Sequence, residues 1–229
     1  MKAVCEKYGA LLILDEVMCG MGRTGTLHAW QDEGVAPDLQ TIGKGLGGGY
    51  RPVAGLLISR RIVDVLENGS GIFVHGHTYQ AHLSACAAAL EVQRIVVSDN
   101  LLENVRDKGS RLSRQLRSNL DSHAHVGDIR GKGLFWGVEF VFDRRTKDPF
   151  PRHAQIAARL SDLALTEPYG ITVYPGAGTV DGYSGDHIIL APPYTITDSD
   201  VDLLVESVTK LIRHFFHYEI NLPEKSRDS

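Results

Sequence analysis

The segment Ala10–Asp15, ALLILD, is a continuous apolar run that ends in an acidic residue. Such a run is typical of a strand buried on both faces, as in a parallel sheet. Two further short apolar runs, Leu39–Ile42 and Val53–Ser59, predict two more strands, and a helical pattern follows over Gln80–Val97. Short apolar strands that alternate with helical stretches are typical of α/β proteins. The sequence therefore predicts an α/β fold.

The pattern changes after about residue 120, at the end of a leucine-striped helix expected near 101–120. The rest of the chain mixes short strands and helices in the manner of a smaller α+β domain. Strands are expected at 126–130, 134–142, 171–174 and 187–191, and helices at 152–167 and 198–217. We therefore expect a larger domain over 1–120, a small domain over 121–220 and a disordered tail over 221–229.

Composition and charge exclude several classes of protein. The formal net charge is -4, and no basic run is interleaved with aromatic residues, so nothing indicates a nucleic-acid partner or an anionic membrane surface. The three cysteines lack CxxC spacing, which favours a reducing compartment. The longest apolar run is too short to span a bilayer, and the first residues lack an apolar signal core. We expect a cytoplasmic protein.

A lysine flanked by glycines follows the second predicted strand, within Thr41–Tyr50, TIGKGLGGGY. Glycines allow the backbone to approach a ligand closely. The glycine spacing formally matches a dinucleotide fingerprint, but no βαβ unit with an acidic residue at the required distance follows, and a Walker loop needs Ser or Thr after Lys44. Considered alone, Lys44 is more often a solvated loop residue than a catalyst.

Two other positions have both a functional and a structural interpretation. Asp15 ends a predicted strand, and ligands of open α/β sheets bind beyond the carboxyl ends of the strands. Thr78 precedes the alanine-rich helix, where it could bind a phosphate or simply cap the helix. His75, His77 and His82 raise the question of a metal site, although their spacing matches no strong zinc pattern.

Taken in order, five segments of the chain resemble the class III aminotransferases of pyridoxal-phosphate (PLP) fold type I, and especially the branch acting on ω-amino acids and amines. The segments are LLILDEVMCGMGRTG, PDLQTIGKGLGGGY, GHTYQAHLSACAAALEV, RGKGLFWGVEFV and GDHIILAPPYTIT. The resemblance covers nearly the whole chain. Its most specific element is the pair of Asp15 and Lys44, whose positions differ by 29 (44 − 15).

The resemblance implies a cofactor, a reaction and roles for four residues. Asp15 matches the acid that pairs with the pyridine nitrogen of PLP, and Val17 matches the residue that packs on its ring. Lys44 matches the lysine that forms a Schiff base with PLP and then moves a proton during catalysis. Thr78 matches the threonine that reaches the phosphate bound by the neighbouring subunit. A homodimer and ping-pong transfer from an amine to a keto acid are implied.

The chain departs from the family pattern in two ways. The upstream half, which supplies a phosphate cup and an aromatic ring over the cofactor, is absent, so we expect a fragment or an N-terminally shortened protein. No arginine lies in 174–185, where many relatives bind a substrate carboxylate, which favours an amine or ω-amino acid donor. Three alternatives remain: a non-catalytic remnant that dimerises or binds a relative, another PLP reaction on the same scaffold, and a histidine-based metal enzyme.

Overall fold

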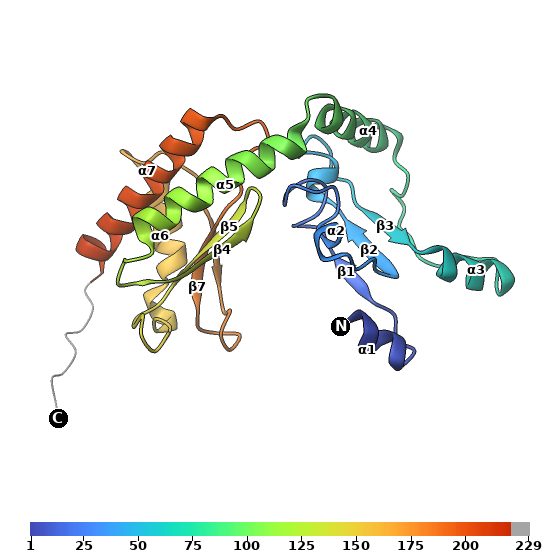
Figure 1. Ribbon diagram of the computed structural model, residues 1–229, viewed down its shortest axis with the longest axis horizontal. Coiled ribbons are helices and arrows are strands. Elements are labelled where there is room, and N and C mark those ends of the chain that lie inside the picture. Colours follow the sequence, from blue (N-terminus) through green and yellow to red (C-terminus); the bar gives the residue numbers. More distant parts are fainter. Residues whose placement is uncertain (221–229) are drawn as a thin grey trace. The chain divides into compact units, whose positions relative to one another are not determined.

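The structure, a computed structural model, describes residues 1–220. It divides the chain into two compact units, Met1–Asp107 and Lys108–Ser229 (Figure 1). The division falls inside helix α5, Leu101–Leu120, whereas the sequence pattern predicts a boundary after residue 120. The tail predicted over 221–229 lies outside the described residues.

Most of α5 belongs to the second unit because its side chains pair with helix α7, Asp198–His214. Lys108 lies 2.9 Å from the Asp198 carboxylate, and Arg111 lies 2.7 Å from Asp202. The leucine stripe of α5 is fully buried at Leu112, Leu116 and Leu120. The apolar stripe that predicts this helix thus also determines the unit to which it belongs.

The first unit contains a sheet in the order β1-β2-β3, formed by Ile13–Asp15, Leu39–Ile42 and Gly55–Ile58. Strands β1 and β2 are parallel, and β3 is antiparallel to β2. The three predicted strands are present, with the first and third shorter than expected. The parallel register pairs Asp15 with Thr41, so two adjacent strands end side by side.

The expectation that the first strand is buried on both faces is wrong. Ile13 is 59% exposed, whereas its neighbour Leu12 is only 5% exposed. Within residues 1–220, β1 pairs with β2 alone, so its other edge is open. The apolar pattern therefore predicted the strand correctly but overestimated how far the strand is buried.

Four helices accompany this sheet: α1 Lys2–Lys7, α2 Trp30–Glu33, α3 Arg60–Asn68 and α4 Leu83–Ser98. Buried Asp38 ties three segments together. Its carboxylate accepts bonds from the Leu12 N–H at 2.8 Å, from Arg61 at 2.8 Å and from Lys2 at 3.1 Å. The Leu12 N–H first, and then Arg61, lower the pKa of Asp38 to about 2. This acid therefore stays charged while it anchors the start of β1.

The second unit contains an antiparallel sheet in the order β4-β5-β7-β6. Its strands are β4 Val126–Lys132, β5 Phe135–Phe140, β6 Tyr174–Ala177 and β7 Asp186–Leu190. Helix α6, Ile156–Ala164, packs on β6 and β7 and against α7. Within residues 1–220, no helix is both long enough and apolar enough to cross a membrane.

Replacing a buried leucine of α5 will test the core of the second unit. Leu116 is 0% exposed, so Leu116→Ala is expected to lower the free energy of unfolding by about 2–5 kcal/mol, as for other buried leucines. Leu203→Ala in α7 is the control, because Leu203 is 62% exposed and its loss is expected to change stability by less than about 0.5 kcal/mol. Urea denaturation measures both. Equal effects would contradict the packing described here.

The second unit is also expected to lose stability in mild acid. The His123 ring packs on Phe216, and its Nδ1 accepts the His125 N–H at 3.2 Å. Burial first, and then nearby His125 and Arg213, hold the pKa of His123 below its ordinary value of 6.5. The unfolded chain therefore binds the proton more readily, so stability is complete above pH 6.5 and falls as the pH drops below it.

His123→Asn keeps a side-chain acceptor but cannot titrate, so it is expected to flatten the fall in stability between neutral and mildly acidic pH. Urea denaturation across that range is the measurement. His153→Asn, at an exposed histidine, is the control and should keep the parent's pH dependence. An unchanged slope in His123→Asn would show that other groups cause the acid sensitivity.

Candidate active site

The carboxylate of Asp15 lies at the C-terminal end of β1, where two donors bind one of its oxygens. Oδ1 accepts the backbone N–H of Val17 at 3.1 Å and the hydroxyl of Thr41 at 2.9 Å. Within residues 1–220, no hydrogen bond is made to Oδ2. The carboxylate is therefore held in one orientation, with one oxygen still able to accept a bond from a ligand.

The surroundings of Asp15 favour its charged form. The Val17 N–H and then the Thr41 hydroxyl lower the pKa of Asp15 below its ordinary 3.8, and burial opposes them. The positive charge of Lys44 lowers the pKa further. Hydrogen bonds that are accepted by the ionised form stabilise it. Asp15 is thus an anion at neutral pH, next to a cationic lysine.

Lys44 begins a short 3-10 turn, Lys44–Leu46, directly after β2. Its φ is 41°, a left-handed conformation that is unusual for a residue with a side chain. Its carbonyl accepts the N–H groups of Gly47 at 3.2 Å and Gly48 at 3.1 Å. A Cβ on Gly47 would lie 2.7 Å from the Arg51 carbonyl oxygen, so only glycine fits there. The glycines therefore let the chain turn tightly behind the lysine.

Helix α4 supports this turn through Gln93. The Gln93 amide donates to the carbonyl oxygens of Gly45 at 3.2 Å and Leu46 at 3.0 Å. These two carbonyls belong to the turn that carries Lys44. A side chain 49 residues further along the chain (93 − 44) thus fixes the backbone behind the lysine.

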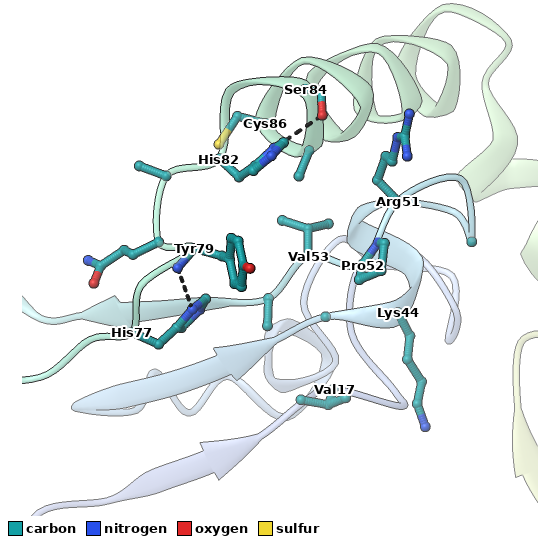
Figure 2. Close-up of a pocket in the computed structure, with 16 residues that line it drawn as sticks. Val17, Lys44, Arg51, Pro52, Val53, His77, Tyr79, His82, Ser84 and Cys86 are labelled. Carbon is teal, nitrogen blue, oxygen red and sulfur yellow. Dashed lines mark hydrogen bonds between the residues drawn. The ribbon is translucent and has the colours of Figure 1, made fainter.

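A cavity of about 970 Å³ adjoins this region within the first unit, and both Val17 and Lys44 line it. Its far wall is formed by the segment before α4, which includes Tyr79 and His82. Figure 2 shows the Lys44 side chain pointing away from Tyr79 and His82, on the side where Val17 lies. Val17 also lies near the lysine turn, because a Cβ on Gly43 would lie 3.4 Å from its Cγ1.

The structure brings together three of the four predicted site residues. Asp15, Val17 and Lys44 gather at the ends of β1 and β2. Thr78 is exposed, and within the described chain no hydrogen bond links its side chain to Asp15 or Lys44. The N-cap of α4 is His82, so Thr78 does not cap that helix.

Thr41 and Gln93 are the two site residues that the sequence analysis did not predict. The sequence could have indicated Thr41, because it lies at the end of the strand predicted beside the one that ends in Asp15. In a parallel sheet, a hydroxyl at that position can reach the Asp15 carboxylate. Nothing in the sequence indicated Gln93, because its hydrogen bonds to Gly45 and Leu46 depend on how α4 packs.

The adjacent acid, Glu16, has a structural role. Glu16 is 3% exposed and accepts the N–H groups of Ala29 and Trp30, each at 2.8 Å. It also accepts the Gln40 amide at 2.8 Å. These bonds hold the start of α2 against the sheet. Within residues 1–220, both oxygens of Glu16 accept hydrogen bonds, whereas Asp15 at the end of β1 keeps Oδ2 available.

Metal and thiol chemistry find little support in this region. Within the described part of the chain, no group of three or more His, Cys, Asp or Glu side chains is placed to hold a metal ion. Burial and then the negative charge of Glu16 raise the pKa of the Cys19 thiol. A thiol with a raised pKa is a poor nucleophile at neutral pH.

The family model described as aminotransferase class-III matches residues 1–212, so this chain belongs to the class III aminotransferases. It has the α/β architecture of PLP-dependent fold type I enzymes. An aminotransferase of Gibberella zeae is 54% identical over 212 residues, which cover 93% of this chain and 41% of that protein.

Solved structures give the same assignment. An (S)-enantioselective omega-transaminase from Thermomicrobium roseum is 39% identical with a TM-score of 0.81, covering 92% of this chain and 45% of that one. A PLP-bound amine transaminase from an uncultivated Pseudomonas species is 37% identical with a TM-score of 0.83, covering 93% and 46%. This chain therefore spans less than half the length of these relatives.

Removing the Gln93 amide is expected to loosen the lysine turn. Gln93→Leu should lower the free energy of unfolding by about 1 kcal/mol, the usual net value of a hydrogen bond, and speed amide exchange at Gly47 and Gly48. Arg94→Leu is the matched control, because Arg94 is exposed on the same helix and pairs only weakly, at 3.4 Å, with exposed Glu91. Hydrogen exchange followed by NMR measures the effect. Unchanged amide exchange at Gly47 and Gly48 in Gln93→Leu would show that the turn is stable without the Gln93 hydrogen bonds.

Proposed function

We propose that this chain carries the cofactor-binding acid and lysine of a PLP-dependent aminotransferase. The enzyme would transfer an amino group from an amine or ω-amino acid to a keto acid by a ping-pong mechanism. The observation that carries the proposal is the placement of Asp15 and Lys44. They lie at the ends of two adjacent strands, an anion beside a cation, in a chain of this family.

The residues at this site fit PLP in their chemistry. Asp15 Oδ2 would accept the pyridine N–H, and its negative charge would keep that nitrogen protonated. Val17 would pack against the ring, since it lines the cavity next to Lys44. When bound, PLP supplies an acceptor for the electrons that are released when the substrate Cα loses its proton. The PLP-bound relative supports this choice of cofactor.

Lys44 would have two roles. Its amine would hold the cofactor covalently and, once displaced by the substrate amine, would move a proton between the substrate Cα and C4′ of the cofactor. The tight glycine turn and the Gln93 bonds would limit the backbone motion of Lys44 while it does so. A fixed backbone with a flexible four-carbon side chain suits a group that must act at two atoms.

Thr78 would act in a neighbouring subunit, so the functional form would be a homodimer with the active site at its interface. Its exposure supports this assignment. The first unit would be the remainder of the PLP-binding domain, and the second would be the small domain.

The segment that contains β6 and leads to β7 supports the proposed substrate class. The segment 174–185 contains no arginine to pair with a substrate carboxylate. The omega-transaminase and amine transaminase relatives support an amine or ω-amino acid donor. A keto acid would be the acceptor in the proposed ping-pong scheme.

Cofactor capture by the 229-residue chain tests the proposal. The chain mixed with PLP is expected to show a visible absorbance band, and borohydride should fix the cofactor mass on the peptide that contains Lys44. Lys44→Ala should lose both signals, whereas Lys7→Ala, at an exposed lysine of α1, should keep them. A chain that stays colourless and unlabelled with PLP would favour the non-catalytic remnant.

A further inference from the structure

We propose that Thr41 is a positioning residue that orients the carboxylate of Asp15 toward the cofactor. This inference rests on the proposed function, because it concerns the same site. The Thr41 side chain does not line the cavity, and within residues 1–220 it makes no hydrogen bond to Lys44. It acts through Asp15, and the supporting observations are a strand register, a hydrogen bond and the contrast with Glu16.

The strand register places the two residues directly opposite each other. Asp15 and Thr41 are paired at the last position of the parallel ladder between β1 and β2. The Thr41 hydroxyl donates to Asp15 Oδ1 at 2.9 Å, a good distance for an O–H donor and a carboxylate. Because the backbone ladder fixes the spacing, the hydroxyl meets the carboxylate without reorganisation.

The two donors at Oδ1 have different origins. Val17 contributes a backbone N–H, which almost any residue at that position would offer. Thr41 contributes a side-chain hydroxyl, and within residues 1–220 Asp15 is its hydrogen-bond partner. Among residues 1–220, Thr41 is therefore the only donor to this carboxylate that depends on which side chain is present.

Two bonds to Oδ1 define the plane of the carboxylate and direct Oδ2 away from them. A single bond would leave the carboxylate free to rotate about its terminal torsion, which is broad for aspartate. Glu16 shows the opposite arrangement, since both of its oxygens are occupied by α2 and Gln40. Asp15, held on one oxygen only, is suited to bind a ligand with the other.

Titration of the Asp15 carboxyl group tests this role without any cofactor. In the full chain with 13C-labelled aspartate, the Asp15 signal is identified by its loss in Asp15→Asn. Thr41→Val keeps the shape but removes the donor, so the pKa of Asp15 is expected to rise toward its ordinary 3.8. Thr41→Ser keeps the hydroxyl and should titrate like the parent. Thr166→Val, a control in the second unit, should leave the signal unchanged.

Binding of pyridoxine 5′-phosphate provides a second measurement. This probe has the pyridine nitrogen and the phosphate but no aldehyde, so it cannot bond covalently to Lys44. Thr41→Val is expected to weaken its binding by roughly two- to tenfold at neutral pH, and Thr41→Ser should restore it. Calorimetry measures the affinity.

The two proposals fail in different ways. If Lys44 is never labelled by PLP, the proposed function fails, and the carboxyl titration still decides the role of Thr41. If PLP labels Lys44 but Thr41→Val leaves the titration of Asp15 unchanged in a folded chain, the role of Thr41 is overturned and the proposed function stands. A raised pKa in Thr41→Val that Thr41→Ser does not share supports the inference.

Discussion

The parallel pairing of β1 with β2 is the constraint on which the rest of the site depends. It places the ends of two strands side by side, with Asp15 opposite Thr41 and Lys44 three residues further on. Local contacts add to this register, from the Val17 N–H to Asp15 and from the N–H groups of Gly47 and Gly48 to the Lys44 carbonyl. A slip of one residue in the register would direct the side chains of one strand to the other face and separate the carboxylate from its hydroxyl donor.

Around this pairing, the chain uses backbone and side-chain contacts in different ways. Lys44 is placed by backbone geometry: a left-handed φ, a glycine that no other residue could replace, and carbonyls held from α4 by Gln93. Asp15 is placed by donors that converge on one oxygen. The base is thus anchored at its backbone and free at its tip, whereas the acid is fixed at its functional group. That difference matches the roles proposed for them, since Lys44 would move a proton and Asp15 would keep a proton on the pyridine nitrogen.

The elements of the fold that depend on local pattern were predictable. The apolar run 39–42, the leucine stripe of α5 and the strands expected at 126–130 and 134–142 are all present. Helix α3 was not predicted. The open edge of β1 was not predicted, because an apolar strand has the same sequence pattern whether or not another strand pairs with it. The division at Asp107 differs from the boundary predicted after residue 120, and α5 residues beyond Asp107 form salt bridges with α7, which is distant in sequence.

The sequence alone determined the family, the α/β class and the chemical groups of the candidate site, because the order and spacing of its motifs are carried by residue identity. It marked Asp15, Val17, Lys44 and Thr78 as one set. Tertiary structure decided which members of that set meet: Asp15, Val17 and Lys44 gather at the ends of β1 and β2, and Thr78 is exposed on the segment before α4. It also decided that Thr41 and Gln93 support them. The physical reason is that a hydrogen bond between strands, or from a helix to a turn, depends on register and packing that no local stretch of sequence contains.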